Sequence, residues 1–416
     1  MNINEILTIT IVLAAIFSYF NHRFIKWPPT IGIMVITLVL SILLAAFGNR
    51  HSMLSEKAVQ LVTSIDFQDV LMNFMLSFLL FAGAIHIDAG KLRNERWPII
   101  ILATVGILIS TFLIGAMMWW LFQLFHQQIP FIYCLLFGAL ISPTDPIAVL
   151  GILKKAKIPE SLELKISGES LFNDGVAVVI FISIIEVARS GNFSAAAMGE
   201  LFLREAIGGL VFGALLGYIG FWALRSIDDY KVEVMITLAI VMGGYYLAGH
   251  LHVSGPLAMV VAGIITGNKS KQEGMSSLTR DYLGKFWELI DEILNVVLFL
   301  LIGLEMLIIK VDTIVFFIGC AAIIIALLAR WLSVLFPVFL LRKRIRFEKH
   351  AIAILTWGGL RGGISVALAL SLSPEMHRDE FVFITYIIVV FSILVQGLTI
   401  GRVAKRLLRP VELLKN

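Results

Sequence analysis

Four polar side chains stand out in an otherwise apolar stretch of the sequence, Gly168-Glu-Ser-Leu-Phe-Asn-Asp-Gly175. On a helix, which turns about 100° per residue, Glu169, Ser170, Asn173 and Asp174 cover about 140° of one face. Two carboxylates, a hydroxyl and an amide then point in one direction. Hard oxygen ligands of this kind suit a small cation, and the lack of Cys and His in the cluster argues against zinc or copper. The alternative is a polar network that only joins two helices.

A second group of candidate residues precedes this one, in Ala139-Leu-Ile-Ser-Pro-Thr-Asp-Pro146. The two prolines have no N–H to donate, so the carbonyls of Ala139 and Ser142 lose their usual helical partners. Asp145 before Pro146 has the pattern of an N-cap followed by proline at the first position of a new helix. We expect the helix to break here, which a membrane tolerates only where the break lines a cavity or an ion site. A proline kink with a capping Asp is the alternative.

The second half of the chain carries two positive charges inside apolar runs. Arg330 stands alone in Ile325-Ala-Leu-Leu-Ala-Arg-Trp-Leu-Ser333 and needs a buried anion, for which we propose Glu169. Arg361 lies in Thr356-Trp-Gly-Gly-Leu-Arg-Gly-Gly363, where four glycines weaken a helix interior. We expect a second helix break at Arg361, and close packing of small residues is the alternative.

The elements that carry these residues are predicted to be membrane-spanning helices. The chain is 59% hydrophobic and 15% charged, against about 25% charged in soluble domains. Its apolar runs of about 20 residues match the length of a helix that crosses a bilayer. We expect an all-α polytopic membrane protein with 13 transmembrane helices. The expected spans are 6–21, 30–48, 69–88, 97–125, 131–153, 163–190, 201–226, 232–251, 254–268, 283–309, 312–341, 348–373 and 380–405.

The two predicted breaks fall in the fifth and the twelfth span. An offset of seven spans means that the two halves of the chain cross the membrane in opposite directions. Secondary transporters have this arrangement, with paired interrupted helices that meet at the substrate site. We therefore expect inverted repeats of six helices with two broken helices that cross.

Basic residues indicate the orientation. Alternate loops on one side hold 25 of the 33 Lys and Arg residues, the other side holds 6, and Arg330 and Arg361 lie within spans. By the positive-inside rule the C-terminus is cytoplasmic and the N-terminus is outside, in the cytoplasmic (inner) membrane. The net charge of +4 therefore results from basic loops that set the topology, and we expect no nucleic-acid partner. Cys134 and Cys320 lie in apolar runs without metal-ligand spacing, and we expect no cofactor.

Two other classes of protein use buried acids. A cation channel needs a continuous pore rather than paired broken helices. An intramembrane aspartyl protease would use Asp145 and Asp174 as an acid/base pair that shares a proton. The Gly-x-Gly-Asp signature of such proteases is absent, and their chemistry leaves Arg330 unexplained. We therefore expect a transporter and not an enzyme.

Four motifs occur in the order of a known family: Ser142-Pro-Thr-Asp-Pro146, Gly168 to Gly175, Gly358-Gly-Leu-Arg-Gly362 and Val395-Gln-Gly-Leu-Thr399. With them, nearly the whole chain resembles the NhaP-type branch of the monovalent cation/proton antiporters, which also includes animal sodium/proton exchangers. The resemblance implies a homodimer of 13-helix protomers that exchanges Na⁺ or Li⁺ for H⁺. It also implies a moving core part, about 69–190 and 283–405, and a dimerisation part, about 6–48, 201–268 and some of 283–309.

The resemblance also implies the roles of the candidate residues. Asp174 is then the essential carboxylate that binds the ion and the proton, and the residues expected to help it are Ser170, Glu169, Thr144, Asp145 and Asn173. Arg330 matches the arginine that pairs with the glutamate of the sixth helix, and Arg361 matches the arginine of the broken twelfth helix. Family members with Asn-Asp at the positions of Asn173 and Asp174 resemble electroneutral exchangers. We therefore expect one Na⁺ to exchange for one H⁺, because both compete for Asp174.

Overall fold

The protein is built from helices. A computed structural model describes residues 3–47, 53–145, 147–156, 158–190, 195–273, 277–309, 312–341 and 347–408. Across these ranges the structure contains no β-strand, and the single isolated bridge joins Asp145 to Leu360. The expected all-α fold class is confirmed.

Packing divides the chain into two compact units. The first comprises Met1–Asn94 and Asp174–Ile309, and the second comprises Glu95–Asn173 and Lys310–Asn416. The long helix α11 (Glu160–Ser190) contributes to both units, and the division falls between Asn173 and Asp174. The functional division into a core part and a dimerisation part is a separate matter and stays a prediction.

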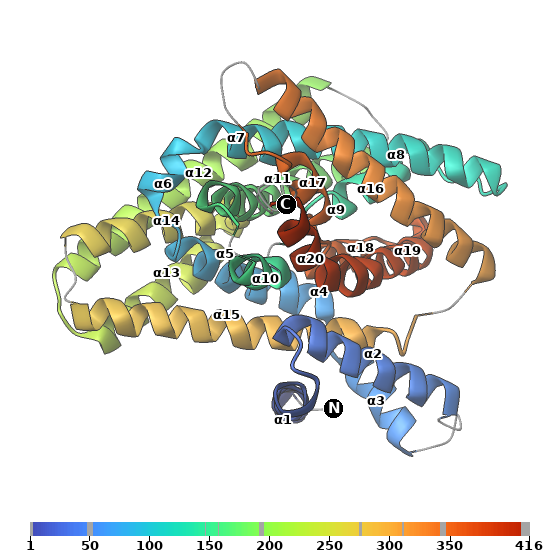
Figure 1. Ribbon diagram of the computed structural model, residues 1–416, viewed down its shortest axis with the longest axis horizontal. Coiled ribbons are helices and arrows are strands. Elements are labelled where there is room, and N and C mark those ends of the chain that lie inside the picture. Colours follow the sequence, from blue (N-terminus) through green and yellow to red (C-terminus); the bar gives the residue numbers. More distant parts are fainter. Residues whose placement is uncertain are drawn as a thin grey trace, which may run out of the picture. The chain divides into compact units, whose positions relative to one another are not determined.

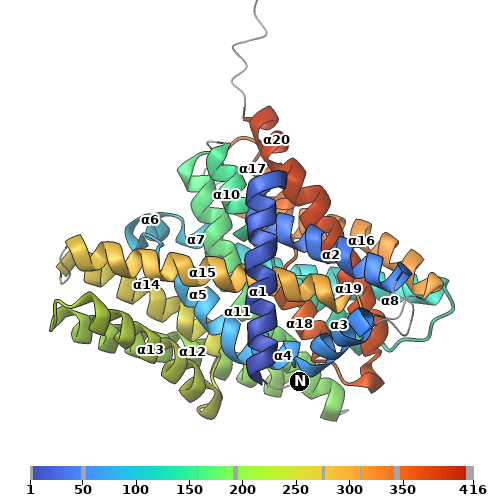
Figure 2. The same ribbon diagram turned by 90° about the horizontal axis from the view of Figure 1, so that it is seen from below.

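The first unit contains several long apolar helices, and two short π-helices, η1 and η2, interrupt or extend helices in it. Figures 1 and 2 show its α-helices. In chain order its elements are α1 (Ile3–Phe20), η1 (Asn21–Ile25), α2 (Pro29–Phe47), α3 (Met53–Ser64), α4 (Phe67–Asp69), η2 (Val70–Met75), α5 (Leu76–Ile85), α6 (Ala89–Asn94), α12 (Ala195–Arg225), α13 (Tyr230–His250), α14 (Gly255–Glu273) and α15 (Ser277–Glu305).

Glycines at every fourth position allow α12 and α14 to approach closely. A Cβ atom on Gly213 would lie 2.4 Å from the carbonyl oxygen of Ala258, and one on Gly217 would lie 2.8 Å from Cβ of Ile265. Helices in lipid gain their packing energy from such small-residue stripes, because no hydrophobic effect drives them together. Figures 1 and 2 show α12, α13 and α14 packed as one group.

The second unit contains the two broken helices. Its elements are α7 (Arg96–Ile101), η3 (Leu102–Gly106), α8 (Ile107–Leu124), α9 (Phe131–Ile141), α10 (Ile147–Lys155), the first part of α11, α16 (Thr313–Leu341), α17 (Ala351–Trp357), α18 (Gly363–Leu370), η4 (Pro374–Met376), α19 (Arg378–Phe391), η5 (Ser392–Gly397) and α20 (Leu398–Leu407).

Both predicted helix breaks are confirmed. α9 ends at Ile141 and α10 begins at Ile147, while α17 ends at Trp357 and α18 begins at Gly363. The two non-helical segments touch, because the main-chain N–H of Asp145 donates to the carbonyl of Leu360 over 2.8 Å. Pro146, the expected first residue of the second half-helix, lies outside the described residues.

Within the described residues, nine helices are long and apolar enough to cross a bilayer, and all nine match expected spans. Of the other four expected spans, 131–153 and 348–373 are the broken helices. Span 254–268 corresponds to α14, and span 283–309 to α15. The chain is therefore a polytopic membrane protein, and the exact count of 13 spans stays a prediction.

Candidate functional site

Arg361 donates hydrogen bonds to main-chain carbonyls at the first break. Its Nη1 donates to the carbonyl of Ser142 and, over 2.9 Å, to that of Pro143. The Ser142 carbonyl is one of the two that the sequence predicts to lack a helical donor. Arg361 is only 3% exposed, so its guanidinium supplies hydrogen bonds that water cannot supply in the interior of a membrane protein. Arg361 thus joins the second broken segment to the first.

Thr144, between the two prolines of the first break, is held by α11. Ser170 Oγ donates to the carbonyl oxygen of Thr144, and Asn173 Nδ2 donates to Thr144 Oγ1 over 2.9 Å. All three residues are buried. Asn173 Oδ1 is also buried, and within the structure it has no hydrogen-bond partner. One turn of α11 therefore presents both a hydroxyl and an unsatisfied amide oxygen beside the broken segment.

The expected pairing of Glu169 with Arg330 is present. The two side chains form a two-point ion pair, with Nη1 to Oε1 at 2.5 Å and Nη2 to Oε2 at 2.8 Å. Arg330 also donates to the carbonyl of Leu355 in α17. Glu169 is 1% exposed and Arg330 is 5% exposed, so each charge depends on the other for its stability.

A small cavity lies within this group of residues. It leaves about 10 Å³ for the centre of a water molecule, and its lining residues are Thr144, Ile166, Glu169, Ser170, Arg330, Leu355, Gly358 and Gly359. That volume holds roughly one particle the size of water. Its lining contains the polar side chains of Thr144 and Ser170 and the ion pair of Glu169 with Arg330, and its size suits one water molecule or one small ion.

Glycines leave room for the side chains at the crossing. A Cβ atom on Gly359 would lie 2.7 Å from Nε of Arg330, and one on Gly362 would lie 2.4 Å from Oδ2 of Asp145. Neither glycine adopts a left-handed backbone conformation. The sequence favoured a break over close packing, and the structure has both, since these glycines lie in the break and are needed for space.

Asp174 follows Asn173 on α11 and belongs to the first unit. It is 8% exposed. Beside it, a Cβ atom on Gly175 would lie 2.6 Å from Cδ2 of Leu257 in α14. The structure therefore brings Thr144, Asp145, Glu169, Ser170, Asn173, Arg330 and Arg361 together within the second unit. It places Asp174 one residue farther along the same helix.

Lys165 is a buried cation that the sequence analysis counted as a loop residue. It lies one turn before Glu169 on α11, is 1% exposed, and pairs with Glu348 at 2.9 Å and Glu95 at 3.2 Å. Ser161 also donates to Glu348. Burial alone would raise the pKa of Glu348, but the hydrogen bonds from Ser161 and Lys165 together hold that pKa below its usual value. The spacing of four residues from Glu169 was the signal that could have identified Lys165.

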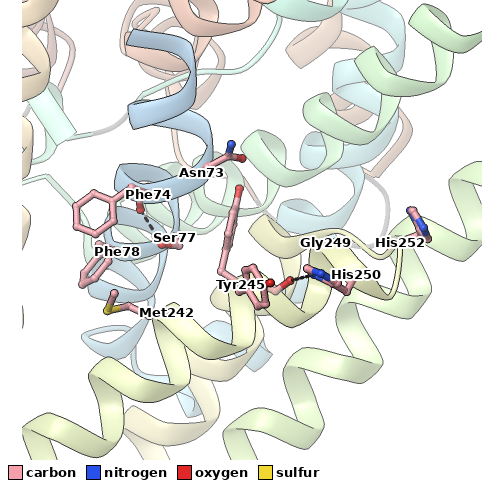
Figure 3. Close-up of a pocket in the computed structure, with 10 residues that line it drawn as sticks. Asn73, Phe74, Ser77, Phe78, Met242, Tyr245, Gly249, His250 and His252 are labelled. Atoms are coloured by element: carbon pink, nitrogen blue, oxygen red, sulfur yellow. Dashed lines mark hydrogen bonds between the residues drawn. The ribbon is translucent and has the colours of Figure 1, made fainter. Parts of the chain in front are cut away.

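A much larger pocket, of about 660 Å³, lies within the first unit (Figure 3). The hydroxyl of Tyr245 in α13 donates to the carbonyl of Met72 in η2 over 2.5 Å. None of its lining residues is acidic, so the pocket offers a cation no carboxylate of its own. The lining residues are Asn73, Phe74, Ser77, Phe78, Met242, Tyr245, Tyr246, Gly249, His250 and His252.

Comparisons with known proteins indicate the family and the fold. Residues 10–406 match the family described as sodium/hydrogen exchanger, transmembrane. The chain is 50% identical over 415 residues to the Na⁺/H⁺ antiporter NhaP of Pseudomonas aeruginosa, covering 97% of each chain. It is 34% identical to the Na⁺/H⁺ antiporter NhaH of Halobacillus dabanensis, covering 92% of this chain and 93% of that one. The sodium proton antiporter MjNhaP1 of Methanocaldococcus jannaschii has a similar fold, with a TM-score of 0.78, 19% identity and coverage of 97% and 98%.

Proposed function

The chain belongs to the sodium/hydrogen exchanger family, and we propose that it is a secondary active antiporter that exchanges Na⁺, or Li⁺, for H⁺ across the cytoplasmic membrane. Relatives that align over nearly their whole length carry the name Na⁺/H⁺ antiporter. Asp174 is the carboxylate at which the two ions compete. Thr144, Ser170 and Glu169 supply further oxygens near the cation, and Asp145 and Asn173 complete the polar site.

One observation carries the choice of a single transporting carboxylate. Glu169 already has a two-point ion pair with Arg330, and both side chains are buried. A buried carboxylate held in this way is part of the architecture, because separating the pair would leave two buried charges without partners. We therefore assign the exchange to Asp174, the next acid along α11 and the carboxylate that the family resemblance makes essential. Glu169 acts mainly as the structural partner of Arg330.

The mechanism follows from the cost of burying a charge. An ionised carboxylate in a low-dielectric site is stabilised either by a proton or by a bound cation. Binding of Na⁺ to Asp174 therefore displaces H⁺, and binding of H⁺ displaces Na⁺. If the site changes the side to which it opens only when Asp174 is neutralised, a gradient of one ion drives the other ion in the opposite direction.

The moving part contains the two broken helices and the start of α11, all in the second unit. The dimerisation part includes α1, α2 and α12 to α14, and the protein acts as a homodimer. The C-terminus is cytoplasmic and the N-terminus is outside. The assignment of the moving part is supported by the hydrogen bonds that join the two broken segments to each other and to α11, because these bonds connect the elements as one body.

The stoichiometry gives the test of this function. With one carboxylate that carries either one Na⁺ or one H⁺, exchange should be electroneutral. Purified protein in liposomes should move protons when challenged with Na⁺ or Li⁺. An imposed membrane potential without an ion gradient should move none. Proton movement driven by the potential alone would show that more than one charge is transferred, and the single-carboxylate mechanism would then be wrong.

A further inference from the structure

The motif Val395-Gln-Gly-Leu-Thr399 has no role in the mechanism described so far. It overlaps η5, a π-helical turn between α19 and α20. Such turns are rare within long helices and occur frequently at functional sites. Two polar side chains of this turn, Ser392 and Gln396, are almost fully buried, at 0% and 3% exposed.

Ser392 and Gln396 bind both ends of the broken segment between α17 and α18. The main-chain N–H of Arg361, near the end of the segment, donates to Ser392 Oγ over 2.9 Å. Gln396 Nε2 donates to the carbonyl of Trp357, the last residue of α17, over 3.1 Å. Ser392 Oγ in turn donates to Gln396 Oε1 over 2.8 Å. One donor and one acceptor at the two ends of the break are therefore connected through a single pair of side chains.

These contacts replace hydrogen bonds that an unbroken helix would make for itself. A main-chain group without a partner is costly in the interior of a membrane protein, where water is not available. The broken segment in turn holds the candidate ion site, because Arg361 donates to the Ser142 and Pro143 carbonyls and Leu360 accepts from Asp145. A shift of η5 would therefore displace Arg361 and, through it, the segment that carries Thr144.

A second small cavity lies beside Arg361. It leaves about 10 Å³ for the centre of a water molecule, and Thr356 and Gln396 are among its lining residues. Nη2 of Arg361 and Oγ1 of Thr356 are buried without a hydrogen-bond partner within the structure. One nitrogen of the Arg361 guanidinium is therefore without a partner within the structure, and the hydrogen bond from the main-chain N–H to Ser392 helps to hold the residue in place.

We propose that Ser392 and Gln396 are positioning residues for the exchange reaction, which hold the second broken segment in register so that Arg361 fixes the oxygens around Thr144. This role rests on the ion site proposed above. Ser392 and Gln396 touch no transported ion, so their loss should weaken cation binding through Arg361 and leave the titrating carboxylate in place.

Two variants break the contacts of η5, and two others serve as controls. Ser392→Ala removes the acceptor for Arg361, and Gln396→Leu removes the donor to Trp357 at similar size. Ser392→Thr keeps a hydroxyl at the same position. Ser183→Ala, on α11, removes a buried hydroxyl that only donates to the carbonyl of Val179 one turn earlier.

The measurement is the Na⁺ concentration that gives half-maximal proton movement in liposomes, together with the melting temperature of each variant. We expect Ser392→Ala and Gln396→Leu to raise that concentration about tenfold, because a lost buried hydrogen bond leaves its partner unsatisfied. Ser392→Thr and Ser183→Ala should stay close to the unchanged protein. If Ser392→Ala and Ser183→Ala lower the melting temperature equally and neither alters the Na⁺ dependence, the positioning role is wrong.

The same assay separates this role from the proposed ion site. Asp174→Asn without transport, together with an unaltered Na⁺ dependence in Ser392→Ala and Gln396→Leu, would overturn the positioning role alone. Full transport in Asp174→Asn would overturn the ion site itself. If Gln396→Leu does not fold, Ser392→Ala and its Thr counterpart still decide the outcome.

Discussion

Two ion-paired groups lie one helical turn apart on α11, and their surroundings differ: Glu169 with Arg330, and Lys165 with Glu95 and Glu348. Glu169 and Arg330 are both buried, at 1% and 5% exposed. Lys165 is equally buried, at 1%, but its partners Glu95 and Glu348 are 19% and 18% exposed. The first pair is closed off from water on both sides, whereas the carboxylates of the second retain contact with water.

This difference determines what each pair can do. When one partner of a fully buried pair is lost, the remaining charge has no way to reach water, and the cost is large. When Lys165 is lost, Glu95 and Glu348 can turn outward and regain solvation. The inner pair, Glu169 with Arg330, therefore fixes the architecture beside the ion site. The outer pair, as we call Lys165 with its two partners Glu95 and Glu348, adds stability that depends on pH.

The largest effect is expected for the inner pair. Glu169→Gln and Arg330→Met should each destabilise the protein by about 3 to 5 kcal/mol, because each leaves an unpaired buried charge. The double variant should recover much of that loss. Melting temperatures in detergent measure all three. Transport need not recover with stability, because Glu169 also contributes to the polar site.

If the double variant is destabilised by the sum of the two single effects, Glu169 and Arg330 are energetically independent. Arg330 would then neutralise another carboxylate, with Asp174 the next candidate. The inner and outer pairs would in that case no longer differ in the way that their burial indicates.

A smaller effect is expected for Lys165→Met, which keeps the apolar stem and removes the charge. The hydrogen bonds to Glu348 and the ion pair with Glu95 disappear, and the expected loss of stability is about 1.5 to 3 kcal/mol. The matched control is Lys285→Met, which removes a cation paired with Asp281 at 2.7 Å on an exposed surface. That variant should melt at an unchanged temperature. A loss for Lys165→Met as large as that for Arg330→Met would contradict the comparison.

The smallest effect is expected for Glu348→Gln, and it should depend on pH. The pKa of Glu348 is lowered in the folded protein, so its ionised form stabilises the fold. This contribution is fully present above the ordinary glutamate pKa of 4.5 and is lost as the pH falls through the lower folded value. The melting temperatures of Glu348→Gln and the unchanged protein should therefore differ at pH 7 and converge as the pH falls below the ordinary glutamate pKa of 4.5. A difference that stays constant with pH would show that the charge of Glu348 contributes nothing.

The sequence predicted those features that follow from a local chemical conflict. Proline removes a main-chain donor, so the break at Ser142 to Pro146 follows from the types of the neighbouring residues alone. A charge in an apolar run needs a partner, which led from Arg330 to Glu169. Both arguments depend only on local residue patterns and on the cost of burying polar groups.

Other features depend on contacts between distant parts of the chain, and the sequence did not reveal them. Apart from its spacing of four residues from Glu169, Lys165 has the same local pattern as a loop cation at the start of a span, and the packing shows it to be buried. The donation from Arg361 to the Ser142 carbonyl joins residues far apart in the chain. The need for space at Gly359 and Gly362 likewise depends on the side chains that lie against them.

The central claim is that Na⁺ and H⁺ compete for Asp174, and Asp174→Asn tests it most directly. The substitution removes the titrating group and keeps its size and polarity. The variant protein should be folded and should melt near the temperature of the unchanged protein. In liposomes challenged with Na⁺ or Li⁺ it should show no cation-driven proton movement, while the unchanged protein does. Substantial proton movement by the folded variant would contradict the account, because the exchange would then use another carboxylate.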